Sequence, residues 1–174
     1  MAIRPCAAAR SALLALQEDL GLGRAVPEEN LHVTLAFLGD QPEAVLQEMH
    51  AALSGIRSKP VTLSLSGVEA RGGRKPALIW AGVETTMPLT QLQSRVRGAA
   101  HQVGIALPRK RFRPHATLAR ITRSARVEEA RLGAWLARHG TFRSAPYAVK
   151  AFCLYRSRLG PDGAMYDVLA TYPL

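Results

Sequence analysis

Hydrophobic and polar residues alternate along this chain with two periods, and the period changes from one segment to the next. Apolar residues at helical spacing, such as Leu13, Leu16 and Leu20, are typical of helices. Other segments alternate apolar and polar residues, as strands do, and Gly- or Pro-rich turns separate them. We therefore expect helices over residues 6–20, 42–56, 88–103 and 125–138, and strands over residues 31–38, 61–70, 77–84, 115–121, 147–159 and 164–174.

The order of these elements repeats, because each half reads helix, strand, helix, strand, strand. This order indicates an internal duplication of a supersecondary unit rather than a short solenoid repeat. With no linker between the halves, we expect an α+β fold, one domain over residues 1–174. Two intertwined lobes related by a pseudo-twofold axis would carry two antiparallel sheets flanking a central cleft, with helices outside. "MAI" is the stub of an opening strand, so either this strand is very short or the chain starts late.

The first strand of each half carries the same polar pair in an apolar stretch. His32 and Thr34 stand in "NLHVTLAFLGD", and His115 and Thr117 stand in "RPHATLAR". Residues two apart on a strand share a face, so each histidine points the same way as its threonine. The duplication would bring the two pairs together across one cleft. Because two such copies among five histidines should arise by chance in roughly one chain in a thousand, we interpret them as one site.

Two imidazoles on one cleft suit acid–base chemistry at phosphorus. A neutral ring can take a proton from the attacking oxygen while a protonated ring gives one to the leaving oxygen. The threonine hydroxyls can donate hydrogen bonds to the non-bridging oxygens, where charge gathers in the transition state. Aspartates are few and no histidine or carboxylate cluster has metal-ligand spacing, so we expect neither a metal nor another cofactor.

Composition indicates a soluble, cytoplasmic protein, which we expect to be a monomer. Of the 174 residues, 48% are apolar, which suffices for a core. No apolar run approaches the roughly 18 to 20 residues of a membrane span, and the N-terminus lacks the apolar block of a signal peptide. Cys6 and Cys153 are at no metal-like spacing, so we expect free thiols.

The net charge of +10 comes almost entirely from arginine, whose guanidinium group can hold a phosphate through two parallel hydrogen bonds. An anionic partner such as RNA fits this charge, but so does a genome that favours Arg and Ala codons. Two basic segments are either RNA contacts or ordinary solvated loops. They are the loop with Arg109, Lys110, Arg111 and Arg113, and the turn with Arg71 and Arg74.

Together these residues resemble the two-histidine (2H) phosphoesterases, and among them the bacterial and archaeal RNA 2′,3′-cyclic phosphodiesterases, also called 2′-5′ RNA ligases. The similarity covers essentially the whole chain. "VPEENLHVTLAFLGD" and "RFRPHATLAR" resemble the family's two signature segments. The tail resembles the family's ending at Ser157, Leu159, Gly163, Tyr166 and Pro173. The N-terminus departs from the pattern, because only "MAIRP" stands where members usually have a fuller apolar strand.

The resemblance implies His32 as proton donor and His115 as proton acceptor, with Thr34 and Thr117 as phosphate ligands. The residues alone leave the two histidine roles exchangeable. It also implies metal-independent hydrolysis of RNA 2′,3′-cyclic phosphate ends to 2′-phosphomonoesters. In reverse it implies ATP-independent joining of RNA ends, such as tRNA halves, through a 2′-5′ bond.

Arg120 is similar to the arginine that ends the family's second motif. Strict alternation from His115 would turn it away from the cleft, so we expect a phosphate contact only if the strand bends near Ala119. The tail strands suggest further RNA contacts at Tyr155, Ser157 and Tyr166. Other rings are expected in the core: Phe37, Trp80, Trp135 and Tyr147. The remaining histidines are expected at the surface or at helix caps: His50, His101 and His139.

Two alternatives remain open from the sequence. The same chemistry could act on another small nucleotide, such as an ADP-ribose cyclic phosphate or a 2′-5′ oligonucleotide. The chain could also be a basic RNA-binding module without turnover, in which case replacing His32 would change only stability.

Overall fold

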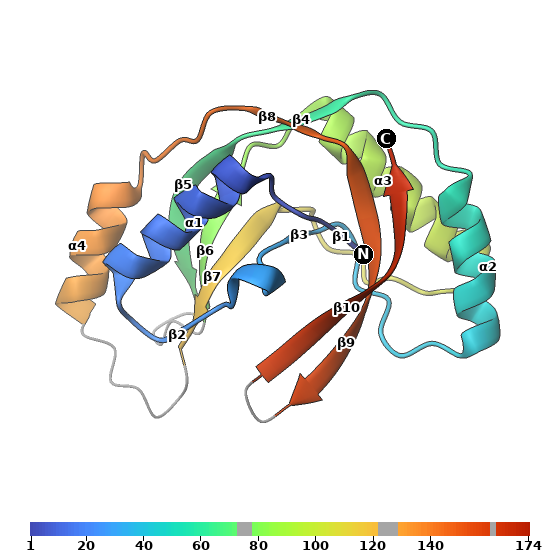
Figure 1. The fold of residues 1–174 in the computed structure, drawn as a ribbon, viewed down its shortest axis with the longest axis horizontal. Coiled ribbons are helices and arrows are strands. Elements are labelled where there is room, and N and C mark those ends of the chain that lie inside the picture. Colours follow the sequence, from blue (N-terminus) through green and yellow to red (C-terminus); the bar gives the residue numbers. More distant parts are fainter. Residues whose placement is uncertain (73–77, 122–128, 161–162) are drawn as a thin grey trace.

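The computed structural model describes residues 1–72, 78–121, 129–160 and 163–174 (Figure 1). This part of the chain contains four α-helices and ten strands, with one 3₁₀ turn, η1 (Glu28–Asn30). The helices are α1 (Ala7–Leu20), α2 (Glu43–Ser54), α3 (Met87–Gln102) and α4 (Glu129–His139). The strands are β1 (Ala2–Ile3), β2 (Arg24–Ala25), β3 (Val33–Thr34), β4 (Val61–Leu63), β5 (Leu65–Arg71), β6 (Leu78–Val83), β7 (His115–Arg120), β8 (Tyr147–Val149), β9 (Ala151–Gly160) and β10 (Gly163–Pro173).

Each predicted helix and strand is confirmed, but three predicted strands are shorter or divided. The strand expected over 31–38 is reduced to β3, because the amides of Leu35 and Ala36 turn to the carbonyl of Met1. The segments expected as single strands over 61–70 and 147–159 each divide in two. They divide because β4 and β8 pair with each other in a separate two-stranded sheet, while β5 and β9 join the main sheet. Residues 125–128 of the fourth predicted helix lie outside the described residues.

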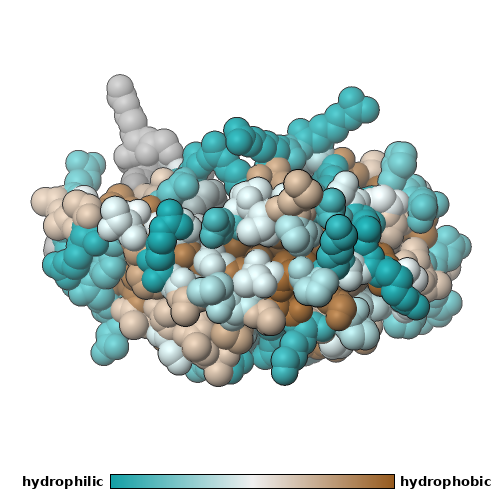
Figure 2. Space-filling model, turned by 90° about the horizontal axis from the view of Figure 1, so that it is seen from above, coloured by the Kyte–Doolittle hydropathy of each residue, from teal (hydrophilic) through white to brown (hydrophobic). Residues whose placement is uncertain are grey.

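The main sheet is antiparallel and runs in the order β10-β9-β1-β3-β7-β6-β5, with β2 paired to β7. The two predicted sheets therefore meet at β3 and β7. Helices α2 and α3 lie on one side of the molecule and α1 and α4 on the other, as expected for two lobes (Figure 1). From above, hydrophilic side chains project from the surface and hydrophobic residues lie mostly in recesses between them (Figure 2).

The two repeated units begin and end at different strands from those predicted. β1 pairs with β3 and β9, and β6 pairs with β7 and β5. β6 is thus the counterpart of β1, and it opens the second half instead of closing the first. The repeated unit is strand, helix, His-x-Thr strand, helix, strand, strand, with β10 added at the end. "MAI" contributes the opening strand of the first unit, a pairing of only two residues.

Candidate active site

The two His-x-Thr pairs lie side by side because β3 and β7 are neighbours in the sheet. Val33 pairs with Ala116, and both are fully buried. Continuing this antiparallel register by one residue in each direction sets each histidine opposite the other pair's threonine: His32 opposite Thr117, and Thr34 opposite His115. All four half-buried residues line one cavity of about 360 Å³, which we call the central cavity. The fold thus brings the two pairs together as the duplication predicts.

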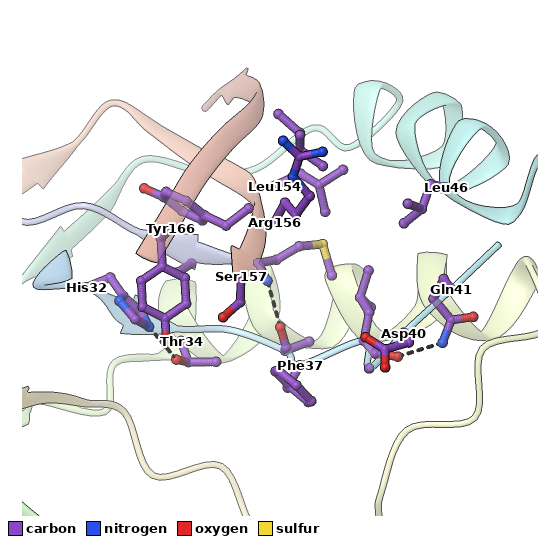
Figure 3. Close-up of a pocket in the computed structure, with 17 residues that line it drawn as sticks. His32, Thr34, Phe37, Asp40, Gln41, Leu46, Leu154, Arg156, Ser157 and Tyr166 are labelled. Carbon is purple, nitrogen blue, oxygen red and sulfur yellow. Dashed lines mark hydrogen bonds between the residues drawn. The ribbon is translucent and has the colours of Figure 1, made fainter. Parts of the chain in front are cut away.

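Both imidazole rings are held in the same way. His32 Nδ1 donates to the carbonyl of Asn30 at 2.7 Å, and His115 Nδ1 donates to the carbonyl of Arg113 at 2.7 Å. Each acceptor stands two residues before its histidine. A carbonyl can only accept, so each neutral ring keeps its proton on Nδ1 and leaves Nε2 for proton transfer. His32 Nε2 lies 3.1 Å from Thr34 Oγ1 (Figure 3).

Burial lowers the pKa of both histidines below the usual 6.5. The Asn30 carbonyl partly opposes this for His32, while the charges of the N-terminus, His115 and Arg120 lower its pKa further. At His115 the Glu69 carboxylate raises the pKa and the Arg71 guanidinium lowers it. Both rings therefore favour the neutral form at neutral pH, and a bound phosphate anion would favour protonation of one of them.

Different aromatic rings flank the two histidines. Trp80 stacks on His115 with a centroid distance of 4.0 Å, and the Arg71 guanidinium lies 5.1 Å from the Trp80 ring centroid. Tyr166 meets His32 edge-on at 5.0 Å. The prediction that Trp80 belongs to the core is wrong. Trp80 pairs with Thr117 across β6 and β7, so it shares the polar face of the sheet and is only half-buried.

Arg120 lines the central cavity because β7 contains a bulge. Ile79 pairs with Ala119 and Trp80 with Thr117, so Leu118 is an extra residue on β7. Because of the bulge, the consecutive residues Leu118 and Ala119 are both buried. The alternation of buried and exposed side chains therefore shifts by one residue, and Arg120 reaches the cavity. This is the bend near Ala119 on which the expected phosphate contact depends.

A second cavity, of about 400 Å³, adjoins the central cavity on the side of His32 (Figure 3). We call it the His32-side cavity. It shares His32, Thr34, Phe37 and Tyr166 with the central cavity. Leu38, Leu46 and Leu154 add apolar surface, and the predicted RNA-contact residues Tyr155, Ser157 and Tyr166 all line it.

Phe37 corrects another prediction, because it is 76% exposed rather than part of the core. Leu35 and Ala36 are both buried, since their amides bond to the carbonyl of Met1. Two consecutive buried residues end the alternation and turn Phe37 outward into the two cavities. The other rings expected in the core do pack there, with Trp135 buried and Tyr147 half-buried against the core.

A third cavity, of about 530 Å³, lies on the other side of His115. We call it the arginine-lined cavity. Its charged lining residues are Glu69, Arg71, Glu84, Arg111, Arg113, His115 and Arg143. Arg109 and Lys110, also predicted to contact RNA, are exposed and line none of these three cavities. Arg74 lies outside the described residues.

The other histidines have structural partners or face solvent. His139 Nε2 lies 2.7 Å from Asp19 Oδ2 near the end of α4, and His50 Nδ1 lies 2.9 Å from the Tyr172 hydroxyl. His50 and His101 are exposed. None of the three lines any of these cavities, as predicted.

Sequence reasoning missed several residues that position the site. Asn30 is buried, and its amide Nδ2 donates to the carbonyl of Ala164 at 2.8 Å, which ties β10 to the segment before His32. Gln17 and Gln93 bond to backbone carbonyls just after the two His-x-Thr pairs. A polar residue among apolar helix positions is a usable signal for the glutamines. No local pattern identifies Asn30, because its partner is distant in sequence.

Within the described ranges, no group of three His, Cys, Asp or Glu residues is placed to hold a metal ion. A search of the same residues finds no helix with the length and apolar character needed to cross a membrane.

Comparison with known proteins gives the family. Residues 5–161 match the model of the 2′-5′ RNA ligase superfamily. The chain belongs to this superfamily. Two relatives, both named RNA 2′,3′-cyclic phosphodiesterase, are each 32% identical to it. The match with the Geobacillus stearothermophilus protein covers 86% of this chain but only 47% of that protein. The match with the Aeropyrum pernix protein covers 84% of this chain and 83% of that protein.

The fold is similar to a solved structure across nearly its whole length. The crystal structure of TT0787 from Thermus thermophilus superposes with a TM-score of 0.80 at 27% identity, covering 99% of this chain and 95% of that one. The superfamily's two-lobed α+β architecture is therefore present here.

Proposed function

We propose that this protein hydrolyses RNA 2′,3′-cyclic phosphate ends to 2′-phosphomonoesters without a metal ion. The observation that carries the proposal is the crossed arrangement of the two His-x-Thr pairs on one cavity, with both Nδ1 atoms anchored to carbonyls. The relatives named RNA 2′,3′-cyclic phosphodiesterase support it.

In the proposed reaction the bond between phosphorus and O3′ breaks and a bond from the water oxygen to phosphorus forms. His115 Nε2 takes a proton from the water, and protonated His32 gives its Nε2 proton to O3′. The hydroxyls of Thr34 and Thr117 and the guanidinium of Arg120 donate to the non-bridging oxygens. The two histidines finish with exchanged protonation states, which solvent resets.

The His32-side cavity suits the nucleoside that bears the cyclic phosphate. It adjoins the ring that would protonate O3′, and it combines apolar and aromatic surface with polar side chains that can orient a nucleoside. The exposed ring of Phe37 offers a stacking surface for a base. Tyr155, Ser157 and Tyr166 lie where they can contact the sugar or the preceding nucleotide.

We further propose that the active unit is a cytoplasmic monomer in which residues 1–174 form one domain of two intertwined lobes. Both halves contribute one His-x-Thr pair to the same cavity, so one copy supplies the whole site. The arginine-rich charge of +10 suits RNA ends such as tRNA halves as substrates. The exposed Arg109 and Lys110 fit a role in attracting RNA over distance rather than in holding it at the site.

The deciding experiment incubates the protein with an oligonucleotide ending in a 2′,3′-cyclic phosphate, in excess chelator. We expect a 2′-phosphate product, and losses of kcat of about a hundredfold or more for His32→Ala and for His115→Ala. His101→Ala, which changes an exposed histidine outside the cavities, is the matched control. Binding without turnover would replace the proposal with an RNA-binding module, and turnover only of a mononucleotide would favour a small-nucleotide phosphodiesterase.

A further inference from the structure

The arginine-lined cavity begins where the central cavity ends, and His115 lines both. The His32-side cavity adjoins the central cavity at the opposite histidine. The three cavities therefore follow one another in the order His32-side, central, arginine-lined. The outer two differ in chemistry. The first is mainly aromatic and apolar, with Asp40 and Arg156 as its charged side chains, whereas the last is lined by four arginines and two glutamates.

The order of the three cavities matches the geometry of displacement at phosphorus. The attacking and leaving oxygens stand on opposite sides of the phosphorus atom in an in-line reaction. In the proposed function the leaving O3′ belongs to the nucleoside in the His32-side cavity. The attacking oxygen therefore enters from the side of His115, where the arginine-lined cavity opens.

We propose that the arginine-lined cavity binds the RNA strand whose 5′-hydroxyl takes the place of water, a role that rests on the proposed function. In joining, the 5′-oxygen bonds to phosphorus, the bond to O3′ breaks, His115 takes the hydroxyl proton and His32 gives a proton to O3′. The strained cyclic phosphate supplies the driving force, so no ATP is consumed. In the reverse direction the same cavity holds the 5′-oxygen strand that leaves from a 2′-5′ junction.

The charges in this cavity suit the backbone of that strand. Arg111, Arg113 and Arg143 are exposed, and none forms an ion pair with another residue of the described ranges. Arg71 is already paired with Glu69 at 2.8 Å. Three guanidinium groups without an ion-pair partner among the described residues, in a cavity next to the reacting phosphate, can each hold a further phosphate.

The same charges argue against this cavity as a nucleobase site. Its aromatic lining residues besides His115 are Trp80 and Phe112: Trp80 already stacks on His115 and lies beneath the Arg71 guanidinium, and Phe112 packs against the core. Recognition here thus falls to the arginines and the phosphates, with little sequence preference. Arg111 and Arg113 of the basic loop then serve the incoming strand rather than the strand that carries the cyclic phosphate.

The test uses RNAs with one 2′-5′ junction that differ in where they are extended. A dinucleoside monophosphate joined 2′-5′ is compared with one carrying three more nucleotides on the 5′-oxygen side, and with one carrying three more on the other side. Wild type, Arg111→Gln/Arg143→Gln and the control Arg95→Gln are assayed for kcat/KM. Arg95 is an exposed arginine of α3 that lines none of the three cavities.

We expect extension on the 5′-oxygen side to raise kcat/KM in wild type and in Arg95→Gln. The double variant should lose about fivefold or more of that gain and keep the effect of extension on the other side. The gain should also shrink as salt rises. The proposal is overturned if wild type gains nothing from extension on the 5′-oxygen side. It is also overturned if the double variant keeps that gain, or loses the effect of extension on the other side instead. Hydrolysis by wild type of an oligonucleotide ending in a 2′,3′-cyclic phosphate, measured alongside, tests the proposed function separately.

Discussion

Gln17 on α1 and Gln93 on α3 occupy equivalent positions in the two halves, and each bonds to the other half's His-x-Thr segment. Gln17 Nε2 donates to the carbonyl of Leu118 at 2.7 Å, and Gln93 Nε2 donates to the carbonyl of Leu35 at 3.4 Å. Each leucine directly follows the threonine of its pair. Each half therefore supplies a helix that holds the His-x-Thr segment of the other, which couples the two halves.

Because Gln17 supports the His-x-Thr segment of the other half, we expect Gln17→Leu to lower both stability and activity. Gln17 also donates to the carbonyl of Val26 at 2.8 Å, so its loss leaves one carbonyl unpaired and a second with one partner fewer. We expect the free energy of unfolding to fall by about 1–3 kcal/mol in urea titrations. Gln93→Leu should cost less, because its single bond is long. Equal losses for the two variants would contradict this ranking.

Part of the site follows from the sequence because a two-residue period holds on any strand. The alternation alone sets His32 with Thr34, and His115 with Thr117, on one face each. The duplicated order of elements then brings the two pairs together. These inferences use only local geometry and symmetry, which survive errors in strand boundaries.

The orientations that could not be predicted depend on contacts between distant segments. Phe37 turns outward because the amides of Leu35 and Ala36 bond to the carbonyl of Met1. Arg120 reaches the cavity because Leu118 bulges out of register with β6. Pairing partners and bulges are tertiary facts, and the alternation pattern does not encode them.

The lowered pKa values of His32 and His115 predict an acidic pH optimum. His115 must be neutral to accept a proton, so kcat/KM falls as pH drops through its pKa. His32 must be protonated to donate, so kcat/KM falls as pH rises through its pKa. Because burial lowers both values, we expect the maximum of kcat/KM for a cyclic phosphate below pH 6.5.

The variant Glu69→Gln tests which histidine sets which limb of this pH profile. The Glu69 carboxylate raises the pKa of His115, so its removal should move the acidic limb of the profile to lower pH. The alkaline limb, assigned to His32, should stay in place. Movement of the alkaline limb alone would exchange the proposed roles of the two histidines.

Trp80 is expected to position His115 through its stacked ring. Trp80→Leu removes that ring, and we expect kcat for cyclic phosphate hydrolysis to fall about tenfold while KM changes little. Trp80→Phe keeps a smaller flat surface and should retain most of kcat. A loss confined to thermal stability, with kcat unchanged in both variants, would show that the stack is only structural.

Gly82 pairs with His115 across β6 and β7 and is expected to tolerate no side chain. A Cβ at this position would lie 2.4 Å from the carbonyl oxygen of Ser66, a backbone atom that cannot swing aside. Gly82→Ala should therefore push β6 away from β5, lower the unfolding free energy by about 1–3 kcal/mol and reduce kcat.

Gly98→Ala is the matched control, because no atom lies within 4 Å of its added Cβ on α3. It should stabilise the protein by about 0.5–1 kcal/mol, so thermal or urea unfolding of the two variants should shift in opposite directions. Shifts of the same sign would mean that the strand beside His115 yields more easily than this close contact implies.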